Sequence, residues 1–317
     1  MSIRFDKAHW ALILGGSSGF GLATAHKLAR HGMNVAVVHR DRRGAMAGIE
    51  AEFAKIRETG VGFASYNVDA LSAEGRAQVL DGLAGAMGSG RVRMVLHSIA
   101  FGNLKLLAPL APQGADAARK ARARLAEKLG VPVDRITAAV DELFAAPEGA
   151  DALAALVDPP AHDSELLLEE EDFARTVFSM GTSHASWAMD VFRRKLFADD
   201  ARVLGMTSEG NEVAWRGYAA VSAAKVALES VSRSLALELA PFGVRSNIVQ
   251  AGVTDTPALR LIPGSAHMKA GARHRNPFGR LTTPADVADF ICLLCTDEAR
   301  WVNGTILRVD GGEHIAG

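Results

Sequence analysis

Short apolar runs alternate along this chain with longer stretches in which apolar residues recur at helical spacing. The run at 34–38, Asn-Val-Ala-Val-Val, is typical of a strand that is covered on both faces of a sheet. Strands are predicted at 10–14, 34–38, 61–68, 93–96, 201–206, 244–249 and 305–309. Helices are predicted at 22–31, 44–59, 73–87, 170–192 and 284–296, with a further one around 218–225. This alternation predicts an α/β fold, a Rossmann-type doubly wound parallel sheet.

The alternation of strands and helices stops after Gly102, and 105–165 contains no convincing strand pattern. Helices are predicted within it at 115–129 and 134–144, with a weaker one near 150–156. We therefore expect a single domain, 1–317, with a helical insertion at 105–165 after the fourth strand. Such an insertion would lie over the carboxyl edge of the sheet, where open α/β folds bind ligands. A second irregular stretch, 254–280, is expected to consist mainly of loops.

The composition is that of a globular protein with a sizeable core, since 49% of the residues are hydrophobic. The formal net charge is −1, so no global field favours nucleic acid or an anionic membrane as a partner. No apolar run reaches the roughly 18 residues that a membrane span needs, and the first residues lack a signal-peptide pattern. We expect a soluble cytoplasmic protein.

The two cysteines, Cys292 and Cys295, have the CxxC spacing of some redox pairs and metal sites. They lie in an apolar run that is typical of a buried helix face, and no second Cys/His pair accompanies them. We interpret both as small core residues and predict no metal site.

Gly15, Gly19 and Gly21 lie between the first predicted strand and the helix that follows it. Bare backbone at this turn lets a pyrophosphate approach the helix N-terminus, where N–H groups and the helix dipole favour an anion. The strand–turn–helix context predicts a dinucleotide site.

The end of the second predicted strand, His39 to Arg43, decides which dinucleotide is favoured. Arg40, with Arg42 or Arg43, could clamp a 2′-phosphate, which favours NADPH. Asp41 keeps NADH as an alternative, because an acid near this position usually accepts hydrogen bonds from the ribose of NAD.

Tyr218 and Lys225 are the candidate catalytic residues. They are separated by seven positions, almost two turns of helix, so both side chains are expected on one helix face. A phenol can donate a hydrogen bond to a substrate oxygen. A neighbouring ammonium can hold a cofactor ribose and favour negative charge on that oxygen.

These residues together resemble the short-chain dehydrogenase/reductase superfamily, specifically its enoyl-[acyl-carrier-protein] reductase branch. In most members the tyrosine lies four residues before the lysine, where this chain has Val221, which has no proton to donate. The seven-residue spacing is that of the enoyl reductases. Three further segments also match the family's motifs: 96–100 (Leu-His-Ser-Ile-Ala), 251–256 (Ala-Gly-Val-Thr-Asp-Thr) and 310–312 (Asp-Gly-Gly). The resemblance covers most of the chain apart from the insertion.

The resemblance implies a cofactor site that is assembled from several motifs. Its residues are Gly15, Ser17, Ser18, Gly19, Phe20 and Gly21 at the phosphates, Asn67 and Val68 at the adenine, Ser98, Ile99 and Ala100 along the cofactor, Gly252, Val253, Thr254 and Thr256 at the nicotinamide, and Lys225 at its ribose. His97 is interpreted as structural. Many enoyl reductases carry a further tyrosine ten residues before the catalytic one, and here that position is Ser208, with Trp215 nearby to fill the space.

The function implied by the resemblance is NADPH-dependent reduction of the C=C bond of a 2-enoyl thioester, of the fatty-acid-synthesis type, on acyl carrier protein or coenzyme A. The alternatives are a carbonyl reductase of the 3-ketoacyl type and a non-catalytic NADP-binding regulatory protein. The resemblance also implies a homotetramer. The first helix of the insertion carries a group of basic residues, which would either dock an acidic carrier protein or form the solvated face of a lid: Arg119, Lys120, Arg122, Arg124 and Lys128.

Overall fold

The computed structural model describes residues 3–110, 115–146, 150–163 and 165–316. Within these residues, seven parallel strands form one sheet in the order β3-β2-β1-β4-β5-β6-β7. The strands are β1 His9–Leu14, β2 Asn34–His39, β3 Phe63–Asn67, β4 Arg91–His97, β5 Phe197–Ser208, β6 Val244–Ala251 and β7 Ile306–Val309. Since β1 pairs with both β2 and β4, the direction of winding reverses there, and the predicted doubly wound α/β fold is confirmed.

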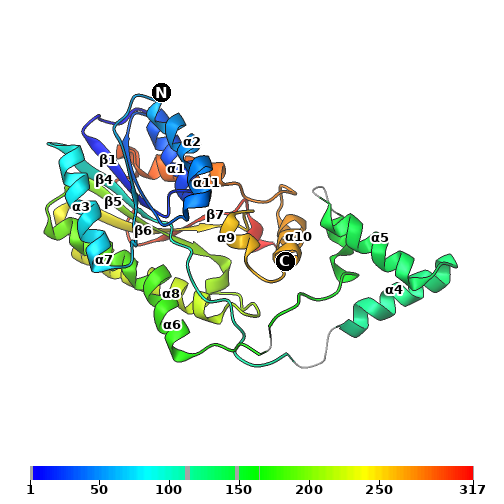
Figure 1. Ribbon diagram of the computed structural model, residues 1–317. Helices are drawn as coiled ribbons and strands as arrows, with labels where there is room; N and C mark the ends of the chain where they lie inside the picture. The colour runs from blue at the N-terminus through cyan, green and yellow to red at the C-terminus, as the bar shows by residue number, and fades with distance from the viewer. Residues whose placement is uncertain (1–2, 111–114, 147–149, 164, 317) are drawn as a thin grey trace.

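Helices cover both faces of the sheet (Figure 1). One layer contains α1 Gly19–Arg30, α2 Met46–Arg57 and α11 Pro284–Leu294, and the other contains α3 Ala73–Met87, α6 Glu170–Val177, α7 Ser183–Arg193 and α8 Ala219–Glu238. Successive residues of β1 point into two separate cores, Ile13 toward α1 and α11, and Leu12 toward α3 and α7. Burial on both faces explains why the central strands are continuous apolar runs.

Two stretches differ from the sequence prediction. The helix predicted at 170–192 contains a π-helical turn at Phe178–Thr182, where Gly181 packs on α8 so closely that a Cβ would lie 2.7 Å from the Ala224 carbonyl oxygen. The stretch 254–280, predicted as loops, contains α9 Pro257–Arg260 and α10 Ser265–Arg275. Neither departure has a local periodic signal, because both depend on contacts with other elements.

The insertion forms α4 Ala115–Leu129, α5 Val133–Ala145 and the 3-10 turn η2 Asp151–Ala155, so its two strong helices are as predicted and the weaker one is a 3-10 turn. Its two ends meet at the body, where Leu106 and Leu167 form an isolated parallel bridge. In Figure 1, α4 and α5 extend beyond the body, and α5 returns toward α10. Arg122 is buried and pairs with Asp158 at 2.5 Å, so it does not belong to the exposed basic face that the sequence suggested.

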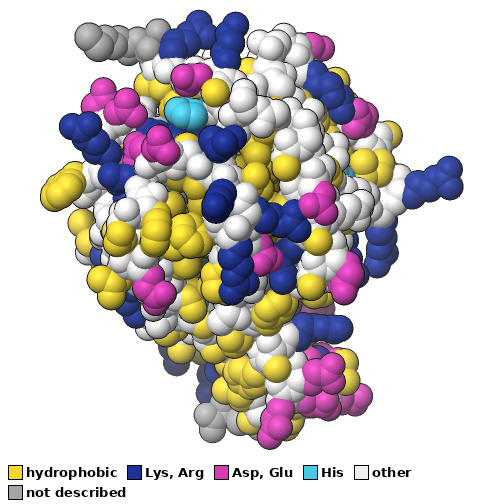
Figure 2. Space-filling view, turned by 90° about the vertical axis from the view of Figure 1, so that its left-hand side faces the viewer, with side chains coloured by type: hydrophobic (Ala, Val, Ile, Leu, Met, Phe, Trp, Pro, Cys, Tyr) yellow, Lys and Arg dark blue, Asp and Glu magenta, His cyan; other side chains and the backbone are white. Residues whose placement is uncertain are grey.

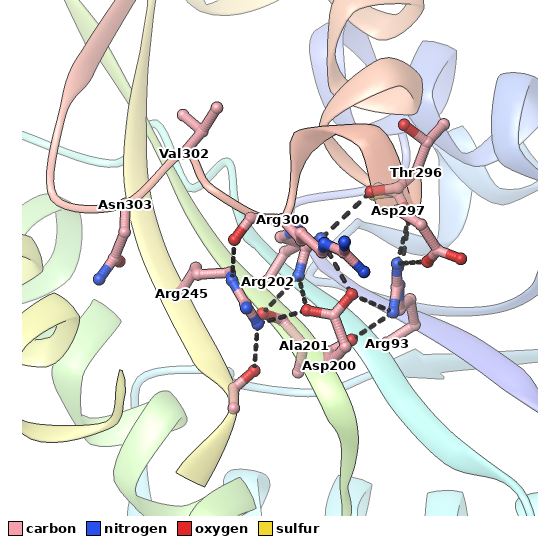
Figure 3. Close-up of polar contacts among 12 residues, drawn as sticks. Arg93, Asp200, Ala201, Arg202, Arg245, Thr296, Asp297, Arg300, Val302 and Asn303 are labelled. Atoms are coloured by element: carbon pink, nitrogen blue, oxygen red, sulfur yellow. Dashed lines mark hydrogen bonds and ion pairs between the residues drawn. The ribbon is translucent and has the colours of Figure 1, made fainter. Parts of the chain in front are cut away.

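A cluster of charged side chains joins the amino-terminal parts of β4, β5 and β6 to the end of α11 (Figure 3). Asp200 lies among the guanidinium groups of Arg93, Arg202 and Arg245. Arg202, fully buried, also donates to the carbonyl oxygens of Leu294 at 2.8 Å and Thr296 at 3.1 Å. The side chains therefore satisfy carbonyl groups that the end of a helix leaves without partners.

The surface carries charges of both signs. Figure 2 views the side that lies at the left of Figure 1, where Lys and Arg side chains gather near the middle with Asp, Glu and apolar side chains around them. Among the described residues, no helix is long and apolar enough to cross a membrane.

Both cysteines lie in the core. Cys292 and Cys295 are free and buried, and burial raises the pKa of their thiols to about 11 and about 12, respectively. The part of the chain that the structure describes contains no cluster of potential metal ligands. These thiols are therefore poor nucleophiles and act as core residues, as predicted.

Candidate active site

A cavity of about 190 Å³ lies at the carboxyl ends of the central strands. Its walls are mostly apolar and include Leu104, Met180, Val221, Ile262 and Met268. Many residues that the sequence predicted for a site line this one cavity: Phe20, Ser98, Ile99, Ala100, Tyr218, Lys225, Gly252, Val253, Thr254 and Thr256. Motifs far apart in the sequence therefore meet at the point where winding reverses.

Tyr218 lies just before α8, as its N-cap residue, with φ −110° and ψ 1°. Tyr218 and Lys225 both line the one cavity, and although α8 begins only at Ala219, the Tyr218 carbonyl oxygen accepts from the Ser222 amide at 2.8 Å in its first turn. Its ring is buried between Trp215, whose centroid is 5.3 Å away, and Gly210. A Cβ on Gly210 would lie 2.4 Å from the tyrosine ring, so glycine is required there.

Ser208 supplies the polar neighbour of the tyrosine hydroxyl. Its Oγ lies 3.3 Å from the Tyr218 hydroxyl oxygen, at the end of β5. Burial raises the pKa of Tyr218, and the Ser208 contact opposes this only in part. The phenol therefore stays protonated and can donate a hydrogen bond. The sequence had identified Ser208 only as a departure from a family pattern, so its contact with Tyr218 is new information from the structure.

Lys225 emerges from α8 into the same cavity and is fully buried. Its Nζ donates to the Met206 carbonyl oxygen at 2.8 Å, which uses one of its three N–H donors. Burial lowers the pKa of Lys225 to about 8, and the charge of Glu229 works in the opposite direction. The ammonium therefore loses its charge at a lower pH than an exposed lysine would.

The glycine loop is as tight as predicted. Gly15 has φ +81°, and a Cβ there would lie 2.5 Å from the Ser98 carbonyl oxygen, while a Cβ on Gly21 would lie 2.2 Å from the Gly15 carbonyl oxygen. Ser18, the exposed N-cap residue of α1, has an extended backbone and does not cap the helix with its side chain. Bare backbone at a helix N-terminus fits the pyrophosphate of a dinucleotide.

The segment after β2 lies beside this loop, because Gly15 and Gly16 donate to the Val38 carbonyl oxygen. Arg40 is 67% exposed and reaches Asp69 at 3.3 Å. The Asp41 carboxylate is turned toward His39, at 2.9 Å. The Asn67 side chain bonds the Asp41 backbone through both its oxygen and its nitrogen, which shapes the predicted adenine side of the site.

The loop after β6 uses several of its polar groups internally. Thr256 accepts from the Leu259 amide and caps α9, and the Thr254 hydroxyl donates to the Gly252 carbonyl oxygen at 2.9 Å. The Val253 amide donates to Glu313 at 3.1 Å, and burial raises the pKa of this carboxyl group.

Two further residues of this network were missed by the sequence reasoning. Arg275 donates to both oxygens of Glu209, at 2.8 and 3.0 Å, and lies 3.5 Å from Glu313. Glu209 lines the cavity. No local pattern could have connected three residues so far apart in the chain.

His97 lies behind the cavity in a fully buried position. Its Nε2 is 2.8 Å from the Ser183 hydroxyl, and its ring packs on His184 with centroids 5.6 Å apart. Burial holds the pKa of His97 well below its ordinary value, so the ring is neutral. This arrangement fits the structural role that we expected for it.

A parallel doubly wound sheet with a glycine loop after its first strand places the molecule in the Rossmann class of folds. Residues 130–314 match the family model described as enoyl-(acyl carrier protein) reductase, and residues 9–108 match the model described as short chain dehydrogenase. The chain therefore belongs to the short-chain dehydrogenase/reductase superfamily, within its enoyl reductase branch, and is an oxidoreductase of that superfamily. The two matches leave out residues 109–129, which include α4.

Individual relatives are similar over different shares of the chain. Cis-4-hydroxycyclohexanecarboxylate dehydrogenase of Sinomonas cyclohexanicum is 29% identical over 75% of this chain and 96% of that protein. Enoyl-[acyl-carrier-protein] reductase [NADH] FabI of Aquifex aeolicus is 31% identical over 46% of this chain and 56% of that protein. The 1-cyclohexenylcarbonyl-CoA reductase of Streptomyces collinus is 35% identical over 38% of this chain and 44% of that protein. For the latter two, the aligned part spans only about half of the relative.

Solved structures show the same fold. The Aquifex aeolicus enoyl-[acyl-carrier-protein] reductase superimposes with a TM-score of 0.70 at 21% identity, over the full length of both chains. A short chain dehydrogenase from Burkholderia cenocepacia, in complex with NADP, superimposes with a TM-score of 0.67 at 22% identity over 99% of both chains. At such identities, the likeness establishes the architecture alone.

Proposed function

We propose that the protein reduces the C=C bond of a 2-enoyl thioester with NADPH. The observation that carries the proposal is that Tyr218 and Lys225, seven positions apart, reach one cavity. The same cavity has the apolar Val221 at the position where most members of the superfamily have their tyrosine. The match to the enoyl reductase model and the named activities of two relatives support it.

The residues of the cavity have separable tasks in this reaction. When bound, the nicotinamide supplies a hydride to the β-carbon of the enoyl group. Tyr218 donates a hydrogen bond to the thioester oxygen, where negative charge builds, and so stabilises the transition state. Lys225 offers N–H hydrogen-bond donors to the ribose of the cofactor. Its positive charge, close to the phenol of Tyr218, favours negative charge on the substrate oxygen. A proton taken from solvent water adds at the α-carbon of the enolate and completes the saturated thioester.

A carbonyl reductase is the second candidate, because one relative is named as the dehydrogenase of a hydroxy acid and aligns over 96% of its length. The Ser208–Tyr218 contact also offers a carbonyl oxygen two hydroxyl groups. The deciding experiment follows nicotinamide absorbance with NADPH or NADH and either a 2-enoyl thioester or the matching 3-ketoacyl thioester. We expect turnover with the enoyl compound; turnover with the ketoacyl compound alone would reject the proposal, and turnover with neither would favour the regulatory alternative.

The proposed cofactor preference can be tested at the end of β2. Removing Arg40 and Arg42 together, by R40A/R42A, should lower the NADPH over NADH preference at least tenfold. Each charge-assisted contact to the 2′-phosphate contributes about 1.5–3 kcal/mol, and 1.4 kcal/mol is a factor of ten. The ratio of kcat/KM values for the two cofactors measures this, with R30A, an exposed arginine on α1, as the control. Equal use of both cofactors by the unmodified protein would contradict the prediction.

Activity should depend on the charge of Lys225. We expect NADPH affinity and kcat/KM to fall as pH rises through about 8, because the pKa of Lys225 lies there and its charged form is lost above it. Tyr218 remains protonated in this range, since burial raises its pKa. Fluorescence titration of NADPH from about pH 6 to 9.5 measures the decline. In K225R, whose guanidinium stays charged, the decline with pH should vanish. If the decline persisted in K225R, a group other than Lys225 would be its cause.

Three finer aspects are also proposals. The exposed face of α4, formed by Lys120, Arg124 and Lys128 at four-residue spacing, supports docking of an acidic acyl carrier protein and a role in fatty acid synthesis. A comparison of carrier-linked with coenzyme A-linked substrate tests this docking.

Exposed apolar residues on α8, Val226 and Leu237, support a homotetramer, which light scattering can measure. The two free, buried cysteines support a cytoplasmic location.

A further inference from the structure

One wall of the cavity is formed by the segment 257–275, which contains α9 and α10. Leu261, Ile262 and Met268 of this segment line the cavity. Its first residue follows Thr256, which lies beside the glycine loop. If Gly19 carried a Cβ, that atom would lie 3.5 Å from Cγ2 of Thr256. The position of the segment therefore determines the shape of the cavity on the substrate side and borders the cofactor side.

The insertion contacts this segment at three places along α10. At the start of α10, Pro160 packs closely on Gly264. A Cβ on Gly264, which has φ +81°, would lie 2.4 Å from Cγ of Pro160. In its first turn, the His267 ring packs on Phe144 with centroids 5.1 Å apart.

The third contact lies at the end of α10. Arg273 donates through Nε and Nη2 to both oxygens of Asp151, at 2.6 and 2.5 Å. The two side chains are 31% and 24% exposed, so this bidentate pair is only partly screened by water.

The base of the insertion is fixed to α6, which leads into another part of the cavity lining. Lys105 pairs with Asp172 of α6 at 2.7 Å, and the Asn103 amide donates to the Thr176 hydroxyl at 3.0 Å. Thr176 lies in the last turn of α6, two residues before the π-helical turn that contributes Met180 to the cavity lining. The insertion thus contacts α6 near its base and α10 farther along the chain, and in Figure 1 its helix α5 lies toward α10.

The returning chain also passes the catalytic tyrosine. A Cβ on Gly217 would lie 3.5 Å from Nδ1 of His162, and Gly217 directly precedes Tyr218. The insertion therefore contacts three parts of the chain that contain or adjoin residues of the cavity lining: α6, the residue before Tyr218, and α10.

We propose that the insertion positions the segment 257–275 for substrate binding, with Asp151 as the positioning residue that acts through Arg273. The expected change in KM rests on the proposed enoyl reductase function, whereas the expected change in hydrogen exchange does not. Segments that close over active sites commonly move between open and closed forms. Here three contacts hold α10 in place before any ligand arrives, so less conformational freedom is lost on binding.

The test compares Asp151→Asn with Asp190→Asn. Asp190 forms an arginine pair with Arg76 between α3 and α7, with 27% exposure, on helices that contribute no residue to the cavity. We expect D151N to increase amide hydrogen exchange across 257–275 and to raise KM for the thioester about tenfold, equivalent to 1.4 kcal/mol, with kcat changed by less than about threefold. We expect D190N to change neither quantity. The charge exchange D151R/R273D should restore most of both.

Two results would overturn the proposal: exchange in 257–275 that is the same in D151N and D190N, or a fall in kcat at unchanged KM. A general loss of stability would lower the melting temperature in both variants and raise exchange throughout the chain, which separates it from a local effect. If the protein turned over no thioester at all, the enoyl reductase function would fail. Hydrogen exchange across 257–275 in D151N and D190N would still decide whether Asp151 positions the segment.

Discussion

Tyr218→Phe is expected to lower kcat for a 2-enoyl thioester by about 10²–10⁴-fold, the usual contribution of a positioned proton donor. NADPH affinity should change little, because the phenol is expected to act on the substrate oxygen and not on the cofactor. The substitution removes one oxygen and leaves the ring in its contact with Trp215 and Gly210. The fold and the cavity should therefore stay intact.

The chain offers a matched control, because Tyr66 is its other tyrosine. Tyr66 packs in the core beside α3, away from the cavity, so Y66F should retain turnover. Removal of the Ser208 hydroxyl should have an intermediate effect of several-fold, since one neutral hydrogen bond contributes about 1 kcal/mol. Near-normal enoyl reduction by Y218F would refute the mechanism, whatever the cofactor.

Asp200→Asn is expected to lower the free energy of unfolding by about 3 kcal/mol, the scale of a buried pair that loses one partner. Asp200 is the shared partner of Arg93, Arg202 and Arg245, and Arg202 has no access to water. Urea denaturation measures the loss. Asp297→Asn is the matched control, since Asp297 pairs with Arg93 alone and is 84% exposed, so its removal should cost less than about 1 kcal/mol.

The contribution of Asp200 should also depend on pH. Burial acts to raise the pKa of this carboxyl group, but the three arginines outweigh it and the net shift is downward. A depressed pKa in the folded state means that the stabilisation is complete above the unfolded value, about 3.9, and is lost as pH falls through the folded value. Equal stability of D200N and the unmodified protein at neutral pH would show that the arginines need no shared partner.

The fold and the glycine loop were predictable because their signals are local. The continuous apolar runs exist because β1 and β2 are buried on both faces, and the tight turn at Gly15 and Gly21 requires residues without Cβ. The spacing of Tyr218 and Lys225 identified the two residues, yet not their geometry. A spacing of seven fits one helix, whereas the structure begins α8 only after the tyrosine.

The rest of the site could not be predicted, because it depends on residues that meet only in three dimensions. Glu209, Arg275 and Glu313 come from three separate loops and helices and have no common pattern. The contact of Asp151 with Arg273 joins an insertion to a stretch that the sequence suggested was irregular. The π-helical turn at 178–182 packs closely on α8 through Gly181, and the helical spacing of apolar residues does not reveal this contact.

The paired ends of the insertion have an evolutionary consequence. Because Leu106 and Leu167 are bridge partners, the chain leaves the strand–helix body and returns to it at neighbouring positions, although the segment between them also packs on α10. Such an arm can be acquired, lengthened, exchanged or lost in a lineage without shifting the register of any strand in the sheet. The insertion's contacts with α10 restrain it, so changes in its length elsewhere leave the sheet untouched and can still alter the cavity through α10.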